Sequence, residues 1–470
     1  MRRTVSTLTL SAAAFIDNYA STLWDPEVYG PGVSRVLRLS FSAVALSSPL
    51  LFVIGAVLVI VYNTPLLIFS TPLVLLLVLF AASRVWRLAL GSGVDKELPA
   101  VLAYLLPYTR SPVQIADLIA RLRDEEGYFW FKFEASRLKL LLDLGYDPIS
   151  ALKKLSETTP SRRLAEVIDD YIHVQTLGAS RGQVTILLFR HAMDSVRDQW
   201  RGHIEFGKLV AEGIVAAVVS MVALAPVALL GGGYPVILAL IPLIVAPAGA
   251  LAMLATRPAL GEYRVGYPEA IITLTVPVVA VALNFKLSLE AGLAYLVGMT
   301  IVVEAMALGF RRLSSNAFRE LRAAVDEARL GTIPEDRLAR AEKAAKGVIK
   351  AIISASRVAG TMGVSDALSQ LYSLIEEAQR QVRSASTQAV ILALISVASL
   401  PLAMYSLKIL SASAAPLGMV NTASIEEVLR IMAATSPLIA LSASVLQRGW
   451  LISPLYPLIA QALTMMVLAA

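Results

Sequence analysis

Residues 213–256 read GIVAAVVSMVALAPVALLGGGYPVILALIPLIVAPAGALAMLAT and contain no charged side chain. This run is about twice the roughly 20 apolar residues that one helix needs to cross a bilayer. Three glycines at positions 231–233, followed by Pro235, interrupt it near the middle, which favours a turn. The stretch therefore predicts a helical hairpin with membrane spans over 212–230 and 235–256.

A second uncharged run, over residues 39–83, predicts another hairpin with spans over 43–62 and 65–83. Further apolar stretches bring the count to about nine spans: 267–285, 289–310, 387–407, 429–447 and 450–470. The composition agrees, because 57% of the residues are hydrophobic and 16% are charged, whereas soluble domains have about 45–50% and about 25%. We therefore predict an all-α, polytopic membrane protein.

The distribution of basic residues sets the expected orientation. Lys and Arg accumulate on the cytoplasmic side of a membrane protein. If residues 84–208 are cytoplasmic, all 41 Lys and Arg residues lie inside except Lys286, Lys408 and Arg430. The N-terminus lacks the apolar core of a signal peptide, so we expect it to be retained and cytoplasmic. The predicted location is the cell (cytoplasmic) membrane.

These patterns divide the chain into alternating regions. We expect the following order: an N-terminal cytoplasmic segment over 1–38, a membrane hairpin over 39–83, a cytoplasmic helical domain over 84–208, four spans within 209–310, a second cytoplasmic helical domain over 311–386, and three spans within 387–470.

Residues typical of helix starts and ends indicate a bundle of roughly six helices in the first cytoplasmic domain. Ser111-Pro112 with Gln114 predicts a helix start, and Gly145 predicts the end of a helix over 128–144. Asp147-Pro148 and Pro160-Ser161 open two more helices, and Gly178 ends the second. The helix from about Arg181 runs without a breaker into the span that follows.

The second domain shows the same plan in shorter form. Gly331 is expected to end its first helix, and Thr332 to Glu335 resembles a capping box. Gly360 and Gly363 precede a helix that continues into the span at 387, as Gly178 and Gly182 precede the span at 212. The spacing suggests a degenerate internal duplication.

These residues resemble the type II secretion F-domain family, the platform proteins of type IV pilus, Tad pilus and archaellum machines. The resemblance covers most of residues 40–410, in the archaeal layout. It rests on the order of apolar and helical regions, Lys96-Glu97-Leu98-Pro99, and the run from Glu134 through Gly145-Tyr146-Asp147-Pro148 and Ala151-Leu152 to Pro160-Ser161 and Gly178. One departure is Pro107-Tyr108-Thr109-Arg110-Ser111, which stands where the family usually has a small-glycine pair.

The resemblance implies a mechanical, non-enzymatic role. Members lack catalytic residues, and their cytoplasmic domains contact a hexameric secretion ATPase that feeds pilin-like subunits from the lipid into a filament. Membrane lipids are further expected partners, and the pairing of two copies is left open. The net charge of +6 is mild and forms no basic stripe, which argues against a nucleic-acid partner.

The residues themselves give no sign of catalysis. There is no phosphate-binding GK[ST] loop, no cysteine and no metal-ligand spacing among His173, His191 and His203. We therefore predict no enzyme activity, no cofactor and no metal. Gly91-Ser92-Gly93-Val94-Asp95 approaches the GxGD motif of intramembrane aspartyl peptidases, but it follows a span and has no second intramembrane aspartate.

Several side chains are candidates for binding or coupling. Glu304 lies inside a predicted span, where a charge costs about 2.5–3.5 kcal/mol at mid-depth, so it either locks helices together or lies near the interface. The candidate basic residues for docking a partner are Lys153, Lys154, Arg162, Arg163, Arg337 and Arg340, with a solvated helix face or contact with anionic lipid as the alternatives. The aromatic run Tyr128-Phe129-Trp130-Phe131 fits a bundle core or a partner-binding patch.

The leading hypothesis is thus a membrane platform protein that couples a secretion ATPase to filament assembly. A small-solute transporter is an alternative, because prolines within the spans could break helices at mid-membrane depth. A membrane scaffold without motor coupling is a third reading, which the sequence does not separate from the first.

Overall fold

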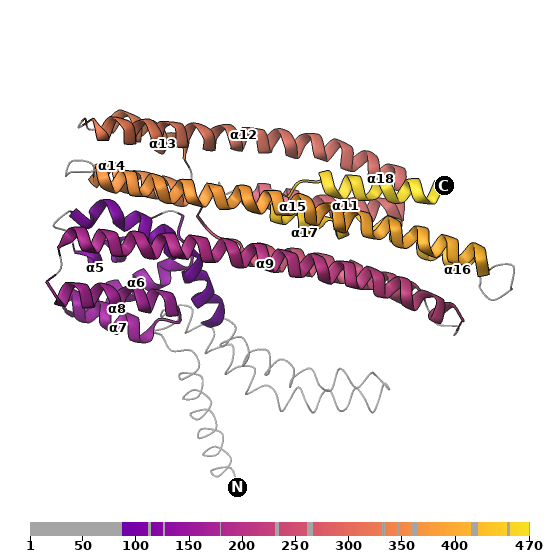
Figure 1. Ribbon diagram of the computed structural model, residues 1–470, viewed down its shortest axis with the longest axis horizontal. Helices are drawn as coiled ribbons and strands as arrows, with labels where there is room; N and C mark the ends of the chain where they lie inside the picture. The colour runs from indigo at the N-terminus through magenta and orange to yellow at the C-terminus, as the bar shows by residue number, and fades with distance from the viewer. Residues whose placement is uncertain are drawn as a thin grey trace, which may run out of the picture. The chain divides into compact units, whose positions relative to one another are not determined.

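The structure is a computed structural model, shown in Figure 1, and it confirms the predicted all-α class. It describes residues 87–110, 114–125, 127–178, 180–230, 235–260, 267–330, 332, 334–345, 347–359, 365–414, 422–448 and 452–469, which contain no strand. The predicted segments 1–38 and 39–83 lie outside this part of the chain. The chain forms two compact units, Met1–Leu188 and Phe189–Ala470, which we call unit 1 and unit 2.

Unit 1 is a bundle of short helices. A helix over residues 87–105 is followed by η1 (Leu106–Arg110), α5 (Ile115–Arg121), α6 (Phe131–Asp143), α7 (Pro148–Thr158), α8 (Arg162–Thr176) and the first residues of α9 (Arg181–Leu230). The core is formed by side chains that are at most 2% exposed, among them Leu98, Leu118, Leu138 and Leu152. Of the apolar residues predicted to face inward on α5 and α8, Ile115, Leu118, Ile119, Leu164, Val167 and Ile168 are buried, whereas Tyr171 and Ile172 are half-buried.

The predicted helix ends in this unit are largely confirmed. Gly145 has a φ of 88° and Gly178 a φ of 70°, so both hold the left-handed conformation that ends α6 and α8. Asp147 caps α7, because its carboxylate accepts a hydrogen bond from the Ser150 amide at 3.0 Å. Ser161 caps α8 through the Leu164 amide, also at 3.0 Å.

Two predicted helix starts are wrong. Helix α5 begins at Ile115 rather than at Pro112, because Gln114 holds an extended backbone with a ψ of 141°. Helix α13 (Glu335–Ala344) is not capped by Thr332, since the Thr332 hydroxyl donates to the Glu327 carbonyl at 2.7 Å. That hydroxyl closes the end of α12 (Leu289–Arg329) instead of opening the next helix.

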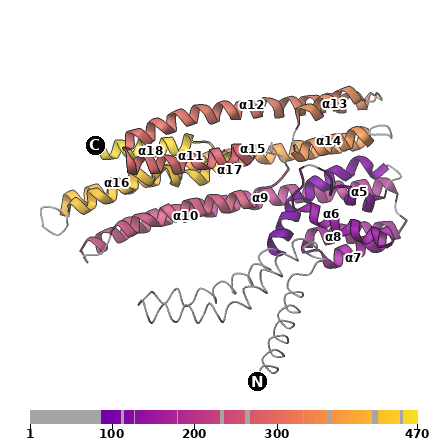
Figure 2. The ribbon, with the colours of Figure 1, turned by 180° about the vertical axis from the view of Figure 1, so that it is seen from behind.

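Unit 2 contains the long helices. After α9 come α10 (Pro235–Thr256), α11 (Tyr267–Lys286), α12, α13, α14 (Gly347–Ala359), α15 (Ser365–Ala414), α16 (Thr422–Ile439), α17 (Leu441–Arg448) and α18 (Leu455–Ala469). Helices α12 and α15 lie side by side along most of the unit, as both views show (Figures 1 and 2). The apolar core between α9, α10, α15 and α17 includes Ala211, Met253, Leu392 and Val445.

Three apolar segments of the described chain are long enough to cross a membrane: Leu289–Arg329, Asp366–Ser413 and Ile425–Gln447. The count of nine predicted spans goes beyond these three. The bounds of α10 coincide with the predicted span over 235–256, and α11 matches 267–285 to within one residue. Ile425–Gln447 is the most deeply buried of the three: 88% of its apolar stretch is buried inside the protein, against 17% for the apolar stretch of α12.

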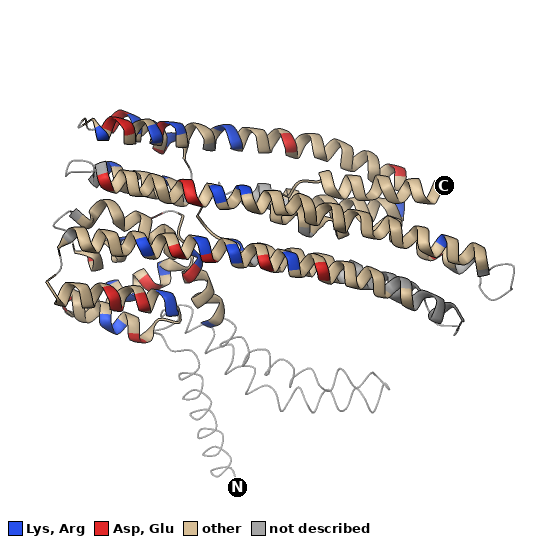
Figure 3. Ribbon diagram, in the orientation of Figure 1, with Lys and Arg blue, Asp and Glu red and all other residues tan. Residues whose placement is uncertain are grey.

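Each of the long helices has a charged half and an apolar half. On α15 the charged residues lie before position 384 except for Lys408, and on α12 most of them lie from Arg311 onward. Figure 3 shows this division along both helices. Helices α9 and α15 are each 50 residues long.

Candidate functional site

Glu97, in the Lys96-Glu97-Leu98-Pro99 stretch, makes a buried polar contact in unit 1. Its carboxylate is 2% exposed and accepts hydrogen bonds from the Phe129 and Phe131 amides, both at 2.8 Å. The residue at the N-cap position of α6, Trp130, makes no side-chain cap bond. Glu97 therefore satisfies amides at the start of α6 from another helix, where a negative charge is also favoured by the helix dipole.

The aromatic run next to Glu97 divides between core and surface. Tyr128 and Phe131 are 2% and 0% exposed, and the Tyr128 hydroxyl donates to the Ala100 carbonyl at 3.2 Å. Phe129 is 49% exposed. The run thus contributes its first and last residues to the bundle core and leaves the Phe129 ring at the surface.

The Gly91-Ser92-Gly93-Val94-Asp95 stretch is a packing surface. A β-carbon on Gly93 would collide with the Trp130 ring, and one on Gly91 would lie 2.7 Å from the Pro160 carbonyl oxygen. Asp95 accepts a hydrogen bond from the Ser161 hydroxyl at 2.5 Å. Burial raises the pKa of Asp95, and the Ser161 hydroxyl opposes this increase. These contacts fasten the helix over 87–105 to the start of α8.

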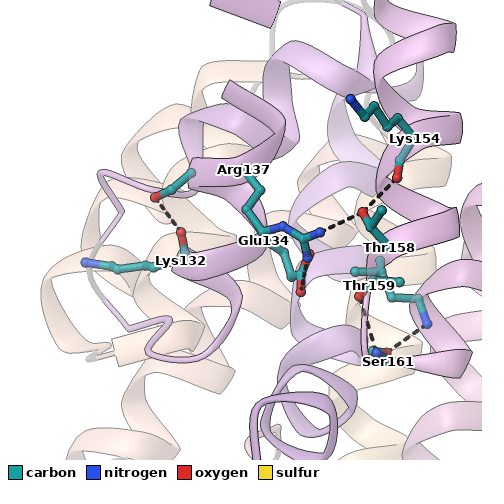
Figure 4. Close-up of polar contacts among 9 residues, drawn as sticks. Lys132, Glu134, Arg137, Lys154, Thr158, Thr159 and Ser161 are labelled. Atoms are coloured by element: carbon teal, nitrogen blue, oxygen red, sulfur yellow. Dashed lines mark hydrogen bonds and ion pairs between the residues drawn. The ribbon is translucent and has the colours of Figure 1, made fainter. Parts of the chain in front are cut away.

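A buried ion pair within α6 is tied to α7 by a hydrogen bond from its arginine (Figure 4). Glu134 is fully buried, and the Arg137 guanidinium donates to both of its carboxylate oxygens at 3.2 and 3.0 Å. Arg137 also donates to the Thr158 hydroxyl at 2.6 Å, and that hydroxyl donates to the Lys154 carbonyl at 2.8 Å. We call Glu134, Arg137 and Thr158 the Glu134 cluster. Burial raises the pKa of the Glu134 carboxyl, and Arg137 partly offsets that rise.

The basic residues predicted for docking in unit 1 lie at or near its surface. Lys153 and Arg162 are exposed, while Lys154 and Arg163 are half-buried. Lys154 lies over the Tyr146 ring at 5.1 Å, and Arg162 pairs with Glu166 at 3.0 Å on one helix face. Such an exposed pair contributes little stability, so it leaves the Arg162 side chain available for another contact.

The two predicted docking residues of α13 are engaged within unit 2. Arg337 pairs with Glu327 at 2.8 Å and with Glu320 at 3.1 Å, and Arg340 pairs with Glu320 at 3.4 Å. Hydrogen bonding to Glu327 and Glu320 raises the pKa of Arg337. These pairs join α13 to the end of α12, a local role that the sequence prediction did not include.

Glu304 of α12 contacts the segment that leads into α18. Its carboxylate accepts a hydrogen bond from the Ser453 hydroxyl at 2.8 Å, and Ser453 is fully buried just before α18. Of the two interpretations of Glu304 from sequence, this contact favours the interhelical lock.

A buried arginine lies directly after α10, and sequence reasoning did not single it out. Arg257 is 5% exposed and donates from Nη1 to the Val445 and Leu446 carbonyls at 2.7 and 3.1 Å. Its guanidinium lies 5.6 Å from the ring centre of Trp200 on α9. We call Arg257, Trp200 and these two carbonyls the Arg257 clamp. Burial lowers the pKa of Arg257 to about 9, so it stays charged at neutral pH.

A second buried contact that sequence reasoning missed joins α11, α12, α16 and α18. The Asn284 side-chain amide donates to the Ala434 carbonyl at 2.9 Å, and Gln461 donates to Asn284 Oδ1 and to the Leu289 carbonyl, both at 2.8 Å. Asn284 and Gln461 are 4% and 0% exposed. We call these two side chains the amide cluster. The signal for it in the sequence is an isolated amide in each of two apolar runs.

The described residues contain no group of three or more His, Cys, Asp or Glu side chains placed to hold a metal ion. The polar contacts described above instead connect helices to one another. Comparison with known proteins gives no match to any family model, any curated protein or any solved structure.

Proposed function

We propose that this protein is an integral-membrane platform of a type IV pilus-like, archaellum-like or type II secretion-like machine. In this role it couples a hexameric cytoplasmic ATPase to the extraction of pilin-like subunits and to filament assembly. The observation that carries the proposal is the continuity of the long helices: α9, α12 and α15 each combine a charged half and an apolar half in one unbroken helix.

Helix length supports a mechanical role. At about 1.5 Å per residue, a 50-residue helix is roughly 75 Å long, more than twice the roughly 30 Å hydrocarbon core of a bilayer. The remainder projects into water. Because an intact helix resists bending, a displacement of its projecting half is carried into the part that lies in the lipid.

The experiment that tests this proposal interrupts one helix while leaving both of its halves intact. The variant carries two glycines inserted after Leu209, an exposed residue of α9. It should abolish filament assembly, because the break in α9 stops a displacement from passing along the helix. The ATPase should still co-purify, because the surface that binds it is unchanged. The matched control is the same insertion after Leu330, at the turn that follows α12, which should retain assembly. Normal filaments after deletion of the gene would overturn the proposal.

The predicted docking surface is tested separately. Reversing the charge at Lys153 and Arg162, both exposed in unit 1, should reduce co-purification of the ATPase. The control reverses the charge of Arg329, an exposed residue at the end of α12. Equal loss with both variants would show that general charge, rather than this surface, governs the association.

A small-solute transporter is the second candidate, and the amide cluster is the observation that favours it. Buried polar groups beside a broken apolar helix are typical of transporter binding sites, and Asn284, which is bonded to Gln461, donates to the Ala434 carbonyl of α16, the helix that ends at Ile439. Substrate-dependent uptake by proteoliposomes, lost in a Gln461→Leu variant, would establish this function instead.

A further inference from the structure

Two pairs of arginines lie where the long helices α12 and α15 change between charged and apolar sequence. Arg311 and Arg312 follow the apolar half of α12, Arg380 and Arg383 precede that of α15, and all four residues are exposed. Helix α12 ends and α15 begins at the same end of unit 2, beside α13 and α14, so the two helices run in opposite directions (Figure 1). The four arginines, which we call the arginine band, therefore lie at the same end of both apolar halves.

The arginine band is not neutralised by the protein itself. Within the described residues, its four guanidinium groups form no hydrogen bond or ion pair. Residues 305–319 of α12 and 378–414 of α15 contain no Asp or Glu. Hydrogen bonding to Gln381 lowers the pKa of Glu377, and Arg380 adds a smaller electrostatic contribution without forming an ion pair. The band is thus a concentration of positive charge that can accept an anion.

Exposed apolar side chains continue from the arginine band along each helix. On α12, Leu308 and Ile301 are 53% and 67% exposed and lie about one and three helical turns from Arg312. On α15, Leu394 is 68% exposed and lies about three turns from Arg383. Whole numbers of turns place side chains on one face of a helix. Each pair of arginines therefore adjoins an apolar stripe on its own helix.

We propose that the arginine band binds the phosphate group of an anionic membrane lipid, whose hydrocarbon chains lie along the apolar stripes of α12 and α15. A guanidinium group forms paired hydrogen bonds with phosphate oxygens, and basic side chains next to a membrane span attract anionic headgroups. The stripes favour a lipid over a soluble phosphate or an acidic protein segment, because the lipid carries its phosphate and its hydrocarbon chains together. The site requires these helices to lie in a membrane but does not require the platform role, so it goes beyond the proposed function.

Thermal unfolding of the detergent-purified full chain with added lipid tests the site. Phosphatidylglycerol should raise the melting temperature in a concentration-dependent way, because a ligand that binds the folded state stabilises it. Phosphatidylcholine with the same chains should raise it less. The fourfold variant Arg311→Gln/Arg312→Gln/Arg380→Gln/Arg383→Gln should bind phosphatidylglycerol at least about tenfold more weakly.

The matched control removes the same amount of charge from other exposed residues of α12, α13 and α14. It carries the substitutions Arg322→Gln, Arg329→Gln, Lys343→Gln and Lys350→Gln. This control should keep the affinity of the unaltered protein for phosphatidylglycerol. An equal loss in both variants would show that net charge, rather than the arginine band, governs binding, and would overturn the proposal.

Two further measurements use the unaltered protein, so they test the proposal even if the fourfold variant does not fold. Inorganic phosphate, at the same concentrations as the lipid, should stabilise the protein less than phosphatidylglycerol does. Raising the salt concentration from about 0.1 M to about 1 M shortens the Debye length from about 10 Å to about 3 Å, so it should weaken the stabilisation by phosphatidylglycerol relative to lipid-free protein at the same salt. Equal stabilisation by inorganic phosphate or by phosphatidylcholine, or a lipid effect that salt leaves unchanged, would refute the lipid site. None of these measurements uses an ATPase or a filament, so their failure is distinct from failure of the platform function.

Discussion

Gly93 lies in the interior of a helix, where alanine is usually the better residue by about 1 kcal/mol. Its position under the Trp130 ring reverses that preference, because an added methyl group has no space. We expect Gly93→Ala to destabilise the protein by about 1–3 kcal/mol, the usual cost of overpacking. The measurement is a lower melting temperature of the purified chain.

The chain offers a matched control for this substitution. Gly202 lies in α9, and a β-carbon there would meet nothing within 4 Å. Gly202→Ala should leave the melting temperature unchanged or raise it. Adding Trp130→Leu to Gly93→Ala should restore part of the lost stability, since it relieves the same collision; strict additivity of the two changes would contradict this account.

The Glu134 cluster gives a pH-dependent prediction. Arg137→Met leaves a fully buried carboxylate without its cation, which typically costs about 3–5 kcal/mol at neutral pH. Burial raises the pKa of Glu134, and loss of Arg137 raises it further. Between the unfolded and folded pKa values the folded state holds the extra proton, so stability falls as pH rises through that window and returns on acidification.

Thermal unfolding from pH 7 down to pH 5 measures this effect. The melting temperature of Arg137→Met should approach that of the unaltered protein as the pH falls. Arg162→Met is the control, because its pair with Glu166 is exposed and should shift stability by less than about 0.5 kcal/mol at any pH in this range. A deficit in Arg137→Met that is independent of pH would mean that Glu134 is not the group responsible.

Among the helices of unit 2, the amide cluster joins α11 to α18 through the hydrogen bond that Gln461 donates to Asn284. Asn284→Leu leaves the Gln461 amide group with one acceptor fewer, and Gln461→Met leaves the Asn284 Oδ1 without the donor that Gln461 supplies. Each should cost about 1–3 kcal/mol, the penalty for a buried polar group without a partner. The double variant should cost less than the sum, as measured by thermal unfolding in detergent, because neither amide is then left behind. Additive losses would show that the two side chains act independently.

Helix ends show how far the sequence could predict these elements. Gly145, Asp147 and Ser161 were predictable because each acts on a backbone group within a few residues of itself. Glu97 and Thr332 were missed or misassigned, since the partner of Glu97 lies more than 30 residues away and Thr332 bonds backward instead of forward.

The bounds of α10 and α11 were predicted to within one residue, because length and absence of charge define an apolar helix without any knowledge of its neighbours. The candidate site was predicted only in part. Glu304 stood out as a lone charge in an apolar run, whereas Arg257 directly follows such a run and looked like an ordinary loop residue. Its burial depends on α9 and α17, which are distant in sequence.

For the whole molecule, the charge pattern predicts that both charged regions face the cytoplasm. The chain contains no cysteine, so single cysteines can be introduced without background. Cysteines replacing Lys153 and Lys343, both exposed, should react with an impermeant maleimide only after intact cells are permeabilised. A cysteine at Leu287, which is 69% exposed between α11 and α12, should react in intact cells. Labelling of Lys153 and Lys343 from opposite faces would refute the topology.

The carboxylate of Glu97 has a consequence for biosynthesis. It leaves the ribosome before the amides of Phe129 and Phe131 that it binds, and domains of a nascent chain generally fold in the order in which they are made. The acceptor for the start of α6 is thus already present when that segment emerges. This order allows the bundle of unit 1 to close during translation, before the hydrophobic helices behind it reach the insertion machinery.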